Sequence, residues 1–254
     1  MPVERLTFVL VTAMLLAARA GAGNPASVTA TSNGGADTPE EPAAVIATGD
    51  FNGDGIADIV KSVQPDGGGA GPQVLEMLLG KADGRFERGD SRNVIGRDPR
   101  AMVVGDFNGD GKLDVIVGDA DGTLLEFTGD GRGHLAPAGK AATLGSAVSI
   151  AVGRFTRSGN LDLVVSDAES NAAVIFLGNG DGSFRQAWSF QLPQKGVEFQ
   201  VATADFNRDG IADIVISTSE DDGNYEVMLG NGNGTFTYAP QLSHLRDPNS
   251  YCPT

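Results

Sequence analysis

Oxygen-bearing side chains recur at a regular spacing in one stretch of the chain. Between the apolar runs 103–104 and 115–117, they occupy positions 1, 3, 5 and 9 of a nine-residue segment: Asp106, Asn108, Asp110 and Asp114. Three carboxylates this close would repel one another unless a cation lay among them. Oxygen-only ligands suit Ca²⁺, which takes about 6–8 oxygens. The backbone carbonyl of Lys112 would supply the ligand at position 7, so the pattern predicts a calcium site.

The same ligand pattern occurs twice more. One set comprises Asp50, Asn52, Asp54, the carbonyl of Ile56, and Asp58; the other comprises Asp205, Asn207, Asp209, the carbonyl of Ile211, and Asp213. A further copy at residues 154–162 keeps the final aspartate, Asp162, but has Arg154 at the first ligand position. We therefore predict three calcium sites and a metal-free third copy. In that copy, the side chain of Arg154 is hypothesised to lie near Asp162.

Two other interpretations of the acidic segment can be weighed. An EF-hand shares the Asp-x-Asn-x-Asp-Gly pattern but needs a glutamate at position 12 and a following helix. Position 12 is Lys61, Val117 or Ile216 here, and β-branched residues follow, so this interpretation fails. Aspartate and asparagine also form turns without any metal. That alternative remains open, although three intact copies of the ligand pattern favour calcium.

The elements that would position these turns are short strands in repeats. A phenylalanine follows the first ligand position at residues 51, 107, 155 and 206, which gives spacings of 56, 48 and 51 residues. Each acidic turn lies between two apolar runs, and a glycine-rich turn such as 178–182 separates two more. Asn-Gly and Asp-Gly turns between β-rich runs are strong hairpin signals. Four antiparallel strands in a repeat of about fifty residues predict an all-β fold, a β-propeller of four four-stranded blades.

The phenylalanine with its acidic turn, together with the turn Leu-Gly-Asn-Gly-Asp-Gly-Ser-Phe at 177–184, resembles the FG-GAP or VCBS repeats of bacterial exported proteins. These repeats are similar to the calcium-bearing blades of integrin α-subunits. The resemblance implies that each acidic turn joins the first two strands of a blade and binds calcium. It covers nearly all of residues 43–240, and the predicted propeller domain spans residues 43–246. Because propellers of this family most often have more blades, the four repeats are either a closed ring or an incomplete sector that pairs with another chain.

The N-terminal segment predicts export. A basic residue, Arg5, precedes an apolar run at 6–18 and small residues at 18–23, so residues 1–22 are interpreted as a signal peptide cleaved after Ala20 or Ala22. The run is shorter than the roughly 20 residues that span a bilayer, so no stable membrane span is expected after cleavage. Residues 23–42 have the composition of a flexible linker, and residues 247–254 form a C-terminal tail. The predicted location is secreted, periplasmic or at the cell surface.

Charge and composition limit the function classes. The formal net charge is −15, and removal of Glu4, Arg5 and Arg19 with the signal peptide brings it to about −16. Such an acidic chain disfavours nucleic acid and anionic lipid as partners. Catalysis has little support, because His134 and His244 are the only histidines and the single cysteine, Cys252, has no partner motif.

Three functions from different classes remain. The first is a non-enzymatic, calcium-binding adhesion module whose loops bind an extracellular protein or glycan. The second is a propeller enzyme that acts on polysaccharide, which would need a cluster of catalytic side chains on one face. The third is a structural sector of a larger assembly, formed by self-association or with another chain. The first is preferred, and the sequence does not name the ligand.

Overall fold

A computed structural model describes residues 45–65, 71–89, 93–191, 199–218 and 225–239. The predicted signal peptide, linker and C-terminal tail lie outside the described residues, as do His244 and Cys252. Every regular element in the described ranges is a β-strand. The first repeat holds β1 (Ile46–Gly49), β2 (Asp58–Val63), β3 (Gln73–Gly80), β4 (Phe86–Arg88) and β5 (Val94–Gly96). The second holds β6 (Pro99–Gly105), β7 (Asp114–Asp119), β8 (Thr123–Gly129) and β9 (Leu135–Thr143).

The last two repeats follow the same plan. The third holds β10 (Ala147–Gly153), β11 (Asp162–Asp167), β12 (Ala172–Gly178) and β13 (Phe184–Gln191), and the fourth holds β14 (Phe199–Ala204), β15 (Asp213–Thr218), β16 (Tyr225–Gly230) and β17 (Phe236–Tyr238). Each repeat forms its own antiparallel sheet, in which strands pair in sequence order. The predicted all-β class, with four antiparallel sheets of about four strands each, is therefore confirmed.

The first sheet departs from the expected four strands. Both β4 and β5 pair with β3: β4 with its C-terminal end through Gly80 and Phe86, and β5 with its N-terminal end through Val74 and Val94. The predicted single fourth strand is thus split in two. The sequence at 89–93 contains glycine, aspartate, serine and asparagine, residues with low β propensity, which accounts for the interruption.

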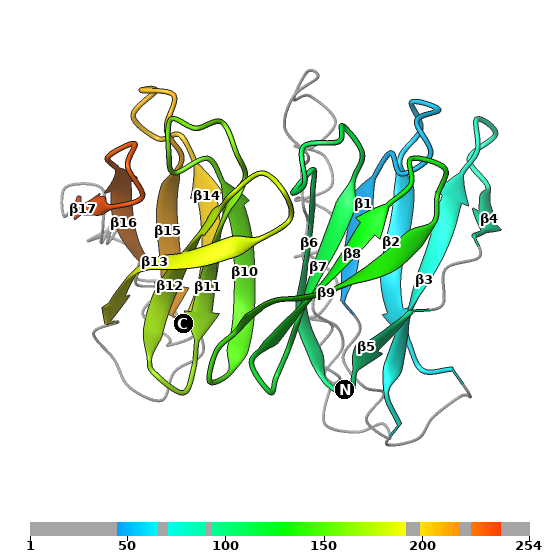
Figure 1. Ribbon diagram of the computed structural model, residues 1–254, viewed down its shortest axis with the longest axis horizontal. Helices are drawn as coiled ribbons and strands as arrows, with labels where there is room; N and C mark the ends of the chain where they lie inside the picture. Colours follow the sequence, from blue (N-terminus) through cyan, green and yellow to red (C-terminus); the bar gives the residue numbers. More distant parts are fainter. Residues whose placement is uncertain (1–44, 66–70, 90–92, 192–198, 219–224, 240–254) are drawn as a thin grey trace, which may run out of the picture.

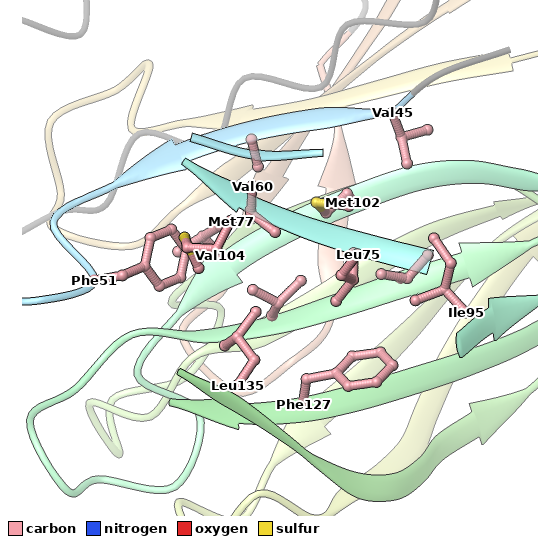
Figure 2. Packing of buried hydrophobic residues seen from close by; sticks show 13 residues of the cluster. Val45, Phe51, Val60, Leu75, Met77, Ile95, Met102, Val104, Phe127 and Leu135 are labelled. Carbon is pink, nitrogen blue, oxygen red and sulfur yellow. The ribbon is translucent and has the colours of Figure 1, made fainter. Parts of the chain in front are cut away.

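The core lies between adjacent sheets. Figure 2 shows one such layer, in which Val60, Leu75 and Met77 of the first repeat face Met102 and Val104 of the second. Two similar clusters join the second repeat to the third and the third to the fourth. Apolar side chains buried between sheets supply the main stabilising free energy, about 25 cal/mol for each Å² removed from water.

The four sheets are arranged in a row, with β4 near one end and β17 near the other (Figure 1). Along the inner side, β1 contacts β6, β6 contacts β10, and β10 contacts β14. Every residue of β7 and β11 is buried, because the middle sheets are covered on both faces, whereas β2 alternates between buried and partly exposed residues. Closure of the row into a ring is not seen among the described residues.

Candidate metal centres

The acidic turns join the first and second strands of their repeats, as expected. In the second repeat, Gly109 and Gly111 have φ angles of 76° and 80°, a region that residues with a β-carbon rarely adopt. The glycines let the backbone wrap around the side chain of Asp106. Its Oδ1 accepts from Gly109 N at 2.8 Å and its Oδ2 accepts from Gly111 N at 2.9 Å. The aspartate at position 1 thus lies inside the turn.

The first and fourth turns repeat this arrangement. Asp50 accepts hydrogen bonds from three later backbone N–H groups of its turn, at 2.7 to 3.1 Å. Asp205 accepts two, at 2.9 and 3.1 Å. In each of the three turns the asparagine Oδ1 accepts from the backbone of the position-5 aspartate, at 2.9 to 3.0 Å. The structure therefore brings together the predicted side-chain ligands at positions 1, 3 and 5.

The final aspartate of each turn has a second set of contacts. Asp114 is fully buried, and its two oxygens accept from Phe107 N at 3.0 Å and from Gly129 N at 2.9 Å. Equivalent pairs of bonds hold Asp58, Asp162 and Asp213, at 2.8 to 3.0 Å. This aspartate therefore ties the acidic turn to the end of the third strand. Because each carboxylate oxygen carries two lone pairs, it can still ligate a cation.

Burial raises the pKa of Asp58, Asp114 and Asp162. Desolvation is the largest cause for Asp58 and Asp114, and it is opposed by their backbone hydrogen bonds. The neighbouring carboxylates at positions 5 and 1, such as Asp54 and Asp50, raise the pKa of Asp58 further. The turns therefore concentrate negative charge that a bound cation would offset.

The third turn is closed differently. Arg154 donates from Nε to the carbonyl oxygen of Gly159 at 3.0 Å, and the Oγ atoms of Thr156 and Ser158 lie 2.8 Å apart. Both carboxylate oxygens of Asp162 accept hydrogen bonds from backbone N–H groups. The Nε atom of Arg154 thus reaches Gly159 in the middle of the turn, and the hypothesis that its side chain lies near Asp162 stays a hypothesis. A built-in cation lies where the other copies have an aspartate.

The donor set of the intact turns fits calcium. It consists of carboxylate, amide and carbonyl oxygens, which Ca²⁺ prefers. In the described part of the chain, no three His, Cys, Asp or Glu side chains converge as a metal cluster. Each predicted site contains three aspartates, at positions 1, 5 and 9, so in this structure the position-9 aspartate does not converge with the other two. In the second turn, Lys112 forms an ion pair with Asp110, with Nζ 3.3 Å from Oδ2, and partly offsets the charge of that carboxylate.

Glu126 is a feature that the sequence reasoning did not single out. It lies on β8 between the second and third sheets, is 6% exposed, and its Oε1 has no hydrogen-bond partner among the described residues. Burial, together with Asp114 and Asp181, raises its pKa to about 7. A glutamate within the apolar run 124–127 was the available signal. Trp188, in contrast, contacts Phe190 and Phe236 and packs, partly buried, against the hydrophobic cluster between the third and fourth sheets.

Each of the first three turns is also linked to the following repeat. Gly133 of the second repeat donates its backbone N–H to the carbonyl oxygen of Phe51 at 3.0 Å. Gly182 and Gly234 donate in the same way to Phe107 and Phe155, at 3.0 and 3.1 Å. We call this bond the glycine latch. Close packing accompanies it, since a β-carbon at Gly133 would approach Leu79 to 2.7 Å.

Comparison with known proteins agrees with this repeat geometry. The family model for the FG-GAP-like repeat matches residues 106–165 and again residues 154–216. No curated protein matches the chain. Within the described ranges, no helix has the length and apolar character needed to cross a bilayer. Because the matched segments coincide with the turns and strands described above, residues 106–216 of this chain are FG-GAP-like repeats.

Proposed function

We propose that the chain is an exported, calcium-stabilised binding module whose loops bind an extracellular protein or glycan without catalysing a reaction. The observation that carries the proposal is the contrast between turns. The first, second and fourth turns each bring oxygen ligands together in a glycine-containing loop. In the third turn, Arg154 instead donates a hydrogen bond to the carbonyl oxygen of Gly159 at 3.0 Å. FG-GAP-like repeats over 106–216 support the same interpretation.

Bound calcium would supply a positive charge to turns that are otherwise crowded with carboxylates. In the second turn Asp106, Asn108, Asp110, the carbonyl of Lys112 and Asp114 would hold it. The chain's own residues do the positioning: Asp114 anchors Phe107 N, and Phe107 O accepts the glycine latch of the next repeat. A cation in the turn would therefore stabilise both one sheet and its junction with the next.

The expected stabilisation is large relative to a typical folding free energy. Extracellular calcium modules bind with dissociation constants of about 10⁻⁴ to 10⁻³ M. At a calcium concentration about ten times that value, each site contributes about 1.4 kcal/mol. Three sites then give about 4 kcal/mol, compared with a total stability of about 5–15 kcal/mol for an ordinary domain.

Titration calorimetry on two matched variants tests the metal assignment. Asp110→Ala removes a predicted ligand, so the measured stoichiometry should fall from three sites to two. Ser158→Ala alters the equivalent position of the third turn and should leave the stoichiometry unchanged. Equal losses in the two variants, or no calcium binding by the wild-type chain, would contradict the proposal.

The binding partner requires a separate test. The purified chain is applied to a glycan array and used in pull-downs from the native cell surface, each in calcium and in chelator. Calcium-dependent capture of a protein or glycan is expected, and the captured glycan should be recovered intact. Turnover of the captured polysaccharide would instead favour an enzyme.

A further inference from the structure

The three junctions between successive repeats share an aromatic or apolar contact. The phenylalanine after the first turn position packs against the first residue of the last strand in the next repeat. Phe155 meets Phe236 edge-on with ring centroids 5.1 Å apart, and Phe107 meets Phe184 at 5.8 Å. In the first junction, Phe51 lies in one cluster with Leu135. This contact therefore marks the internal junctions of the molecule.

Two side chains that correspond to the partners of such a contact are exposed at opposite ends of the row. Phe206 is the fourth repeat's counterpart of Phe155, and it is 47% exposed, whereas Phe51, Phe107 and Phe155 are at most 3% exposed. Phe86 is the first repeat's counterpart of Phe184, and it is 52% exposed. Because β4 and the fourth repeat are at opposite ends in Figure 1, these two rings cannot meet within one chain.

The faces around both rings are apolar. In the fourth repeat, Ala202 and Val215 are cross-strand partners on the face that points away from the third repeat, and both are accessible to solvent. In the first repeat, Ile59 pairs with Leu78 on the face that points away from the second repeat. Each face therefore presents the kind of surface that is buried at the internal junctions.

The outer face of the first repeat also carries charged side chains. Lys61 Nζ and Arg88 Nε lie 3.1 and 3.0 Å from the two carboxylate oxygens of Glu76, so these charges are paired within the face. Gly84, which corresponds to the latch glycine Gly133, donates its N–H to Lys81 O instead. A junction at this face would rely on side-chain packing and would be weaker than an internal one.

We propose that the Phe206 face of one copy binds the Phe86 face of a second copy, head to tail. Two such junctions would close two chains into a ring of eight repeats, within the range of about 4–8 blades known for propellers. A head-to-tail interface either closes into a ring or continues into a filament, and a ring leaves no face unused. No side chain of a predicted calcium ligand takes part, so the pairing goes beyond the proposed binding function.

Sedimentation equilibrium of the full chain across the micromolar range tests the pairing. The wild-type chain should form a reversible dimer. Phe206→Ser and Phe86→Ser should each raise the dissociation constant at least about tenfold, as expected for a central aromatic contact. Both rings are exposed in the single chain, so each variant should melt like the wild-type monomer. Tyr238→Ser is the control. Tyr238 is exposed, but its cross-strand partner Met228 faces the third repeat, so Tyr238 lies on the face of the sheet opposite to the proposed interface.

Mixing the variants separates head-to-tail pairing from other modes. Each variant alone lacks one half of every junction, whereas an equimolar mixture restores one intact junction per pair and should recover dimers. A wild-type chain that stays monomeric throughout the range would overturn the proposal, as would a dimer that Phe86→Ser leaves unchanged. The second outcome would instead indicate that two Phe206 faces meet.

Discussion

At the scale of single residues, the fourth acidic turn contains a conformational strain that the first and second acidic turns avoid. Arg208 has a φ of 63° at the position where Gly53 and Gly109 have 75° and 76°. A residue with a β-carbon pays a steric cost of about 1 kcal/mol in this region. The side chain is exposed, so nothing among the described contacts requires an arginine there.

Arg208→Gly should therefore stabilise the folded chain by about 0.5–1 kcal/mol, because relief of strain exceeds the entropy that glycine adds to the unfolded state. Thermal unfolding in saturating calcium measures the change. Arg157→Gly serves as the control, since Arg157 lies at the equivalent position of the third turn and is not among the residues with positive φ. A gain of the same size in both variants would contradict the strain explanation.

Glu126 makes stability depend on pH. Its pKa is raised from 4.5 to about 7 in the folded chain, so the folded state binds the proton more tightly than the unfolded state. Its contribution is fully present below about pH 4.5 and is lost as the pH rises through about 7. Above that, an ionised carboxylate lies buried between two sheets.

Glu126→Gln should stabilise the chain at pH 8 by about 2–3 kcal/mol, and this gain should shrink towards zero near pH 4.5. Denaturant unfolding at the two pH values, in saturating calcium, measures the difference. Glu169→Gln, at an exposed position, should show the same stability change at both. A pH-independent effect of Glu126→Gln would indicate that packing rather than charge is responsible.

At the scale of elements, the final aspartate explains why the degenerate third turn still resembles the others. Asp162 accepts from Phe155 N at 2.8 Å and from Gly178 N at 3.0 Å, bonds that need no metal. The turn could therefore lose its other carboxylates while keeping this one. The residue has a structural role in addition to the predicted metal role of its counterparts.

Asp162→Asn should destabilise the chain by about 1–3 kcal/mol, because an amide NH₂ would face one of the two buried donors. The loss should be the same in calcium and in chelator. Asp114→Asn, which alters both the same structural contact and a predicted ligand, should cost more in calcium than in chelator. Chemical denaturation of both variants under the two conditions distinguishes these outcomes.

The sequence predicted this level of structure well where a local pattern was sufficient. Apolar runs, with the acidic and glycine-rich turns between them, located strands and turns, because both follow from local backbone preferences. The split between β4 and β5 was missed, since Phe86 and Val94 both read as strand residues and their pairing with opposite ends of β3 is a tertiary property. Glu126 was missed because burial depends on the neighbouring sheet.

At the scale of the whole molecule, the junctions should differ in their need for calcium. The first and second latches end on Phe51 and Phe107, which follow predicted calcium ligands. The third ends on Phe155, whose turn is closed by Arg154. Removal of calcium should therefore weaken the first two junctions and spare the third.

Hydrogen exchange in chelator measures this difference amide by amide. The N–H groups of Gly133 and Gly182 should lose protection, whereas that of Gly234 should keep it. Arg154→Ala should lower the protection of Gly234 equally in calcium and in chelator. Uniform loss at all three glycines would contradict the view that the third turn is independent of the metal.

The sequence also predicted the number of repeats but not their arrangement. Four phenylalanines at regular spacing are visible in one dimension, and each sheet forms within about fifty residues. Whether the fourth sheet returns to the first depends on the angle between sheets, which is set by packing over the whole interface. The exposure of Phe206 could not be read from a motif that it shares with three buried counterparts.

The glycine latch has a consequence for the order in which the repeats fold while the chain is synthesised from its N-terminus. In every latch the acceptor phenylalanine precedes its donor glycine along the chain. Each finished sheet thus offers a docking edge before the next one has been synthesised. Folding can advance vectorially, one repeat at a time, with no segment waiting for a partner that is synthesised much later.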